Sequence, residues 1–266
     1  MQDVAGVDVG LSFQAATTGI CRTAPWILTT AYADRASRLA ALQLKSGDRP
    51  VEVIAIDGPL LPGLAWSTVA RAVESAFQRG SFQKRCKPGA SHVAGTGQGL
   101  RRGGHDAAHH VLPFVSAGGP VTFPRVVPQN IVEAFPNAFL AVLLDDDQVK
   151  TGALQRGERF DVLYDVAAAK LGAVAASLGG GKFFPSFAAI TDHDERAAAV
   201  CALTALGVAN NSYVAVGDDA GGWFFLPAWK WWRPWAKAAI DLGRASTRVD
   251  VWMDAMRHPC TGLLPP

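Results

Sequence analysis

Three short, mainly apolar runs that each end in a carboxylate constrain the fold of this chain more than any other feature of its sequence. The acidic residues that end them are Asp8, Asp57 and Glu133. Short apolar runs are typical of buried strands, and the glycines or prolines that follow favour tight turns. A charged group at the end of a buried strand is costly unless another group compensates it. The sequence therefore predicts an α/β protein with acidic side chains at its strand ends.

The remaining elements are predicted from periodicity and from breaking residues. We expect a strand and a tight turn in the apolar run 4–10, two strands within 11–33, and further strands at 51–56 and 130–133. We expect helices at 34–46, 136–144, 160–178 and 191–206, the first and last of them capped by acidic residues. Residues 62–125 are predicted to form a long irregular insertion with a helix at about 66–79. A C-terminal extension, 208–266, is predicted to contain a hairpin (213–216 with 223–226) and one or two helices within 228–258.

Composition bounds the class of protein. The 266 residues are 49 % hydrophobic and 18 % charged, with a formal net charge of +2, which excludes a disordered polycation. We expect a single domain spanning 1–266. No apolar run is long enough for a membrane span, and the start of the chain lacks a secretory signal. The four scattered cysteines indicate reduced thiols, so we expect a cytoplasmic protein without membrane contact.

Acidic residues at strand ends point to metal chemistry. Ligands bind outside the carboxyl ends of strands in open α/β sheets. Asp192, Asp194 and Glu195 add a second acidic group at the start of a helix. Mg²⁺ or Mn²⁺ prefers carboxylate oxygens, and a pair of such ions catalyses in-line phosphoryl transfer. The pattern thus predicts a metal-dependent phosphodiesterase, although turn formation at the strand ends and helix capping by the 192–195 group explain each part separately.

Several motifs together resemble one known family. GVDVG around Asp8, AIDGPLLP around Asp57, RCKPGASH from Arg85, VEAFPNAFL from Val132, TDHDERAAAVCALTA from Thr191 and GDDAGGWFFLP from Gly217 occur in this order. The chain resembles, over most of its length, the predicted RNase H-like nuclease family catalogued as domain of unknown function 429.

The resemblance implies a fold and a site. The fold is an RNase H-like mixed five-stranded sheet with helices on both faces. Acids on the first strand, the fourth strand and a late helix would hold two Mg²⁺ or Mn²⁺ ions. The metal ligands are then Asp8, Asp57 and Asp194. Glu133, Glu195 and His193 join these three as catalytic candidates.

The late helix departs from the family pattern. Relatives usually carry an acid followed by alanine near the position of Ala197, but residues 197–199 are all alanine. Asp194 or Glu195 would have to replace the missing carboxylate.

A basic segment suggests a nucleic-acid partner. Residues 75–105 contain six basic residues and no acidic one. Contacts to phosphate position a nucleic-acid backbone without reading its sequence. The candidate substrate-binding residues are Lys84, Arg85, Lys87, Arg101 and Arg102; a solvated basic loop is the alternative. Cys86 as a nucleophile and a zinc site at His92, His105, His109 and His110 are weaker possibilities.

The C-terminal extension is rich in tryptophan beside basic residues. The tryptophans are Trp223, Trp229, Trp231, Trp232 and Trp235. Such a group can stack on unpaired bases, but packing against the core is favoured because five exposed tryptophans are rare.

Three functions remain open from the sequence. The first is a metal-dependent nuclease that acts on DNA or RNA. The second is a nucleic-acid-binding protein with a degenerate site, motivated by Ala197. The third is a nucleotide-dependent phosphotransferase of the actin-like ATPase type, against which the first motif lacks a second glycine and a Ser/Thr pair.

Overall fold

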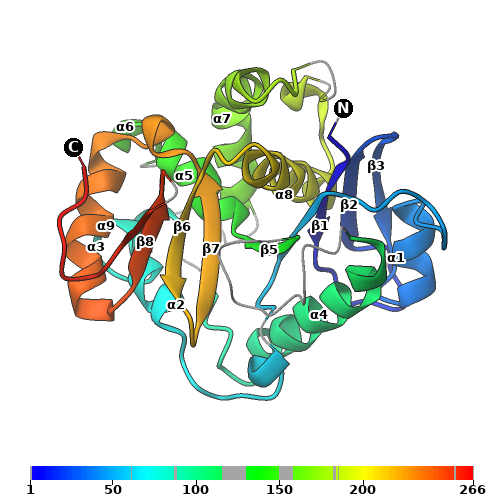
Figure 1. Cartoon of the computed structure of the whole chain (residues 1–266), viewed down its shortest axis with the longest axis horizontal. Coiled ribbons are helices and arrows are strands. Elements are labelled where there is room, and N and C mark those ends of the chain that lie inside the picture. The colour runs from blue at the N-terminus through cyan, green and yellow to red at the C-terminus, as the bar shows by residue number, and fades with distance from the viewer. Residues whose placement is uncertain are drawn as a thin grey trace.

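A nine-stranded mixed sheet organises the described part of the chain in this computed structural model (Figure 1). The structure describes residues 2–60, 62–86, 89–115, 130–149, 158–181, 184, 186–254 and 256–265. The strand order is β3-β2-β1-β4-β5-β7-β6-β8-β9. The strands are β1 (Val4–Asp8), β2 (Thr18–Thr23), β3 (Trp26–Ala31), β4 (Val53–Asp57), β5 (Ile131–Ala134), β6 (Tyr213–Asp218), β7 (Gly222–Pro227), β8 (Asp250–Met253) and β9 (Met256–His258).

Strand direction changes along the sheet. Strands β1, β2 and β3 form an antiparallel meander, whereas β4 pairs in parallel with β1 and β5 pairs in parallel with β4. The hairpin β6–β7 joins the same sheet because β7 pairs in parallel with β5. Strands β8 and β9 then extend it antiparallel. The sheet is mixed as expected, but the expectation of five strands is wrong, because the C-terminal hairpin and the following segment pair with the edge of β5.

Helices pack on both faces of the sheet. The α-helices are α1 (Arg35–Ala41), α2 (Ala72–Phe77), α3 (Gly80–Arg85), α4 (Thr96–Val111), α5 (Pro136–Leu143), α6 (Asp146–Val149), α7 (Glu158–Ser177), α8 (His193–Ala209) and α9 (Pro234–Thr247). Short 3₁₀ turns lie at η1 (Pro62–Leu64), η2 (Leu112–Phe114), η3 (Phe187–Ala189) and η4 (Trp229–Trp231).

Two hydrophobic clusters follow the alternation of side chains along β1 and β4. Val4, Val53 and Ala55 belong to the cluster that contains α5, α7 and α8, whereas Val7 and Ile54 belong to the cluster that contains residues of α4. Successive strand residues point to opposite faces, so each strand is buried on both sides. Double burial explains why these strands are apolar throughout rather than alternating.

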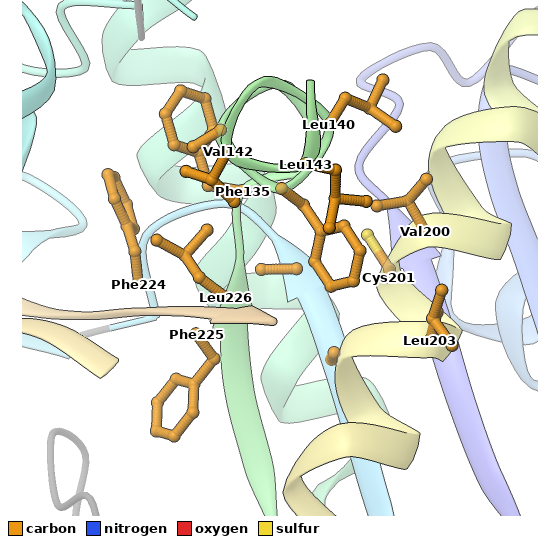
Figure 2. Packing of buried hydrophobic residues seen from close by; sticks show 14 of the residues in the cluster. Phe135, Leu140, Val142, Leu143, Val200, Cys201, Leu203, Phe224, Phe225 and Leu226 are labelled. Carbon is orange, nitrogen blue, oxygen red and sulfur yellow. The ribbon is translucent and has the colours of Figure 1, made fainter. Parts of the chain in front are cut away.

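The large cluster is densest where α5, α8 and β7 meet. Figure 2 shows Leu140 and Leu143 of α5 facing Val200 and Leu203 of α8. On β7, Phe224 and Leu226 point to one side of the strand and Phe225 to the other. Burial of such side chains stabilises the fold by about 1.5–3 kcal/mol each, so this contact fixes α8 against the middle of the sheet.

The insertion is more ordered than its sequence suggests. Instead of one helix at about 66–79 within irregular chain, the described residues form α2, α3 and the sixteen-residue α4. The four glycines of α4 lower its helix propensity and hide its pattern. Two of them, Gly103 and Gly104, lie where α4 touches the segments after β1 and β4. Close packing therefore explains residues that local propensity disfavours.

The C-terminal extension forms one helix and two strands. The expected hairpin is present as β6–β7, and α9 is the expected helix, but Asp250–Met253 and Met256–His258 form the strands β8 and β9. Trp223, Trp229 and Trp232 are buried in the large cluster, and Trp231 and Trp235 pack against it. The packing interpretation of these tryptophans is confirmed.

Candidate functional site

An acidic pair lies at the carboxyl ends of β1 and β4. Asp8 is directly opposite Asp57 in the parallel ladder. Alternation along each strand places both side chains on the face of the sheet that α8 covers, because Val4, Val53 and Ala55 belong to the cluster on that face. The structure thus brings together two of the predicted metal ligands.

Helix α8 approaches the sheet without intervening side chains. A Cβ on Gly6 would lie 2.1 Å from the backbone nitrogen of Ala202, and one on Gly19 would lie 2.0 Å from the carbonyl oxygen of Asp194. Only glycine permits this distance. The contact at Gly19 brings the first turn of α8, including Asp194, against β2, the strand next to β1.

The negative charges of Asp57 and Asp194 both affect the pKa of Asp8. Burial is the largest cause that raises the pKa of Asp8 well above its usual value, followed by the negative charges of Asp57, Asp194 and Asp192. Burial raises the pKa of Asp57 to about 7. The pKa of Asp194 is raised by burial and by Asp192, while His193 acts in the opposite direction. Burial and like charge make ionisation of this group unfavourable.

The charges of the acidic pair act on Cys201, a thiol on α8. Burial raises the pKa of the Cys201 thiol, and the charges of Asp57 and Asp8 raise it further. Cys201 is fully buried on α8, and because its pKa is raised its thiol stays uncharged.

The acidic pair lacks a positive partner among the described residues. Within those ranges, neither the Asp8 nor the Asp57 side chain forms a hydrogen bond or an ion pair with another side chain. The described residues also contain no group of three or more His, Cys, Asp or Glu side chains arranged to hold a metal ion. Two carboxylates offer hard oxygen ligands of the kind that Mg²⁺ and Mn²⁺ prefer. Their chemistry fits a divalent cation, and Asp194, whose charge raises the pKa of Asp8, is the candidate for a third ligand.

Asp192 has a structural role. It is the N-cap of α8, and its Oδ1 accepts a hydrogen bond of 3.0 Å from the backbone N–H of Glu195. Such a cap satisfies one of the free N–H groups of the first turn. The capping interpretation of this acid is confirmed.

The described interactions of Glu195 and His193 are with residues outside the acidic pair. The negative charge of Glu195 acts on Cys21 of β2, and burial raises its own pKa. The His193 Nδ1 lies 3.1 Å from Oδ2 of Asp161, and its ring packs edge-on against Phe160 of α7. Of Asp194, Glu195 and His193, it is Asp194 whose charge acts on Asp8.

Glu133 belongs to a different network. It pairs in register with Ile56, one residue before Asp57, so it points to the opposite face of the sheet. Its Oε1 accepts a hydrogen bond of 2.7 Å from Nη1 of Arg71, and its Oε2 accepts one of 2.5 Å from Nη2. Burial raises the pKa of Glu133 to about 7, and the charge of Arg71 counteracts that effect.

The network around Glu133 extends through buried polar groups that the sequence did not single out. Arg71 Nη1 donates to Glu74, Glu74 accepts from the Ser91 hydroxyl, and Arg101 Nε donates to Ser91 Oγ at 2.8 Å. The only sequence signal for this network is the i,i+3 spacing of Arg71 and Glu74. The network joins α2, β5 and α4, so we assign Glu133 a structural position.

Two of the five predicted substrate-binding side chains have polar or charged partners within the protein. Arg101 is fully buried, and its guanidinium donates to Ser67 O, Val69 O and Ser91 Oγ. Arg85 pairs with Asp146 and lies over the Trp235 ring. All three guanidinium nitrogens of Arg101 and both Nη groups of Arg85 have partners within the protein, which disfavours phosphate binding by these two side chains.

The other three basic candidates differ in position. Lys84 is exposed at the end of α3, and Arg102 is partly exposed on α4 with its guanidinium 5.2 Å from the centre of the Trp66 ring. Lys87 lies outside the described residues.

The weaker alternatives are also located. Cys86 is buried, and its thiol donates to Phe82 O. His105 and His109 lie together on α4 with their Nε2 atoms 3.1 Å apart, while His110 Nδ1 lies 3.4 Å from Arg38.

No described helix is long and apolar enough to cross a membrane.

Comparisons of this chain with protein-family models, with curated proteins and with solved structures found no match. The resemblance to the RNase H-like family therefore stays a prediction, carried by the motifs alone.

Proposed function

We propose that this chain is a metal-dependent nuclease that hydrolyses phosphodiester bonds at a divalent cation held by Asp8, Asp57 and Asp194. The observation that carries the proposal is the direct pairing of Asp8 with Asp57 at the carboxyl ends of two parallel strands, beneath the first turns of α8. No described side chain compensates their charge through a hydrogen bond or an ion pair. A cation would remove this electrostatic cost.

The arrangement of the sheet supports an RNase H-like core. Strands β3-β2-β1-β4-β5 are contiguous and mixed, and α8 packs across β1, β2 and β4. The acids on the first strand, the fourth strand and a late helix are those that the family resemblance implies. We infer that β7-β6-β8-β9 extend such a core on its β5 side.

The residues divide the chemistry between them. A divalent cation, when bound, neutralises phosphate charge and lowers the pKa of water. Asp8 and Asp57 would hold it from rigid strand ends, and Asp194 would reach it from α8. Because the pKa of Asp57 is about 7, a proton competes with the cation near neutrality. Cation affinity should therefore rise as the pH increases from 6 to 8.

The test combines cation binding with cleavage. Wild type should bind Mn²⁺ in calorimetry and cleave labelled oligonucleotides only when Mn²⁺ or Mg²⁺ is present. Asp57→Asn should lose both activities and keep its circular dichroism spectrum. Asp147→Asn, which changes an exposed carboxylate on α6, should behave as wild type. Cleavage that survives in Asp57→Asn would overturn the proposal.

One observation favours a binding protein without catalysis as the second candidate. Ala197 is buried on α8 and brings no carboxylate to the site. Salt-sensitive binding of nucleic acid without turnover, in the presence of bound Mn²⁺, would support this candidate.

A further inference from the structure

Two large aromatic side chains stand exposed on the segments that leave the acidic pair. The Phe13 side chain is 72 % exposed and lies on the loop between β1 and β2, five residues after Asp8. Trp66 is 79 % exposed and lies nine residues after Asp57, between η1 and α2. Among the described residues, neither ring packs against another aromatic ring. Both therefore remain available to a flat partner.

Helix α4 connects the roots of both segments. A Cβ on Gly103 would lie 2.9 Å from Val9 Cγ1 and 2.4 Å from Leu11 Cδ2. A Cβ on Gly104 would lie 2.7 Å from the carbonyl oxygen of Pro59. Val9 directly follows Asp8, and Pro59 lies two residues after Asp57. The middle of α4 thus rests on the chain that leaves each carboxylate.

Trp66 is attached to the same part of α4. The Arg102 guanidinium lies 5.2 Å from the centre of the Trp66 ring, a cation–π contact. Arg101 donates hydrogen bonds of 2.8 Å to Ser67 O and 2.7 Å to Val69 O, which fixes the segment that carries Trp66. Arg102 precedes Gly103, so Trp66 is fixed within one helical turn of the contact with Val9.

Phe13 is held outward by its own turn. The Ser12 hydroxyl accepts hydrogen bonds from the backbone N–H groups of Gln14, at 3.1 Å, and Ala15, at 2.8 Å. Leu11, on the other side of Ser12, packs toward α4 at Gly103. The turn therefore keeps its backbone ordered while the ring of Phe13 faces solvent.

We propose that Phe13, Trp66 and Arg102 form a stacking platform for unpaired bases, which makes single-stranded nucleic acid the substrate class of the acidic site. The inference rests on the proposed function for the phosphate that would lie at Asp8 and Asp57. Aromatic faces stack on any base, but only when that base is unpaired and accessible. Arg102 adds a positive charge beside the Trp66 ring, which complements a phosphate backbone.

Binding of oligonucleotides in EDTA tests the platform separately from catalysis. A fluorescein-labelled 12-nucleotide oligothymidine should bind wild type, and a blunt duplex of the same length should bind at least about tenfold more weakly. Trp66→Ala and Phe13→Ala should each lower the affinity for the single strand about fivefold or more. Trp66→Phe should retain most of it. Leu242→Ala, which removes an equally exposed side chain on α9, should leave the affinity unchanged.

Each other outcome has a defined meaning. If Trp66→Ala and Phe13→Ala bind the single strand as tightly as wild type, or if the duplex binds equally well, the platform is overturned. If Trp66→Ala changes the sedimentation coefficient but not the affinity, the rings form a contact between copies, and the proposal is again overturned. Loss of binding in these variants, with no Mn²⁺ binding by wild type, would support the platform and reject only the nuclease.

Discussion

The ionisation of a single carboxyl, Asp57, makes stability depend on pH. Burial raises its pKa from 3.8 to about 7 in the folded protein. Between these values the folded state holds a proton that the unfolded state has lost, so stability falls as the pH rises through this range. We expect Asp57→Asn to show a shallower fall between pH 5 and 8, and to exceed wild type in stability by roughly 4 kcal/mol at pH 8, since a rise from 3.8 to about 7 is worth about 1.4 kcal/mol per pKa unit.

Urea unfolding in EDTA at pH 5, 6, 7 and 8 measures this difference. Asp147→Asn should follow wild type at every pH, because its carboxylate is exposed. A slope in Asp57→Asn as steep as that of wild type would show that Asp57 ionises normally in the folded protein.

For Glu133 we predict the opposite of what a catalytic acid would show: its substitution should affect stability and not Mn²⁺ binding. Its carboxylate and Arg71 form a buried bidentate ion pair. Glu133→Gln leaves Glu74 as the charged partner of the buried Arg71, and breaking a buried ion pair typically costs about 3–5 kcal/mol. Glu133→Gln should therefore lose stability on that scale at pH 8 while it keeps wild-type Mn²⁺ affinity.

An exposed ion pair provides the comparison for Glu133. Asp219→Asn breaks a contact with Arg257 at the surface and should cost less than about 1 kcal/mol. Chemical denaturation and calorimetric titration with Mn²⁺ measure the two effects. A variant Glu133→Gln that is stable but fails to bind Mn²⁺ would place Glu133 in the metal site instead.

At the scale of elements, a missing Cβ sets the position of α8. The Cβ of an alanine at residue 19 would lie 2.0 Å from the carbonyl oxygen of Asp194, which is a backbone atom that cannot rotate away. Gly19→Ala should therefore displace the first turn of α8 from β2. We expect a loss of Mn²⁺ affinity of at least about tenfold and a destabilisation of about 1–3 kcal/mol, as for other overpacked cores.

The matched control for Gly19 is a glycine with open space around it. Gly243 lies in α9, and a Cβ there would meet nothing within 4 Å. Gly243→Ala should stabilise the protein by about 0.5–1 kcal/mol through helix propensity, without a change in Mn²⁺ binding. Thermal unfolding and calorimetry separate the two variants, and unchanged Mn²⁺ affinity in Gly19→Ala would show that α8 does not position Asp194 for the cation.

Elements with a strong apolar pattern were the ones that could be predicted from the sequence. Strands β1, β4 and β5 are buried on both faces, and α8 carries a side-chain cap, so their signals are local. Helix α4 was missed because its glycines serve contacts with distant segments. Strands β8 and β9 were missed because they are short and their pairing is decided by the edge of β6.

The site residues show the same difference between local sequence signals and contacts with distant segments. Adjacent acids at the ends of parallel strands follow from the strand pattern, which is why Asp8 and Asp57 were placed together. The separation of Glu133 depends on register, because a shift of one residue moves a side chain to the opposite face. The acceptors of Arg101 come from a segment about thirty residues earlier in the chain, which local pattern does not reveal.

Across the whole molecule, a small net charge makes binding of nucleic acid depend on the local charge at the site. The formal net charge is +2, so the protein as a whole attracts a polyanion weakly. Without a cation at pH 8, the ionised carboxylate of Asp57, whose pKa is about 7, repels phosphate. We expect Ca²⁺, which also prefers carboxylate oxygens, to raise the affinity for a single-stranded oligonucleotide at pH 8.

A double variant separates this local effect from general screening. Asp8→Asn/Asp57→Asn should bind the strand more tightly than wild type in EDTA, because the repulsion is gone, and Ca²⁺ should no longer raise its affinity. Contact with two or three phosphates predicts a slope of log K against log salt of about −1.5 to −2. Anisotropy titrations between 50 and 300 mM salt measure all three quantities. An equal gain from Ca²⁺ in wild type and double variant would mean that the cation acts elsewhere, and that the acidic pair does not face the bound strand.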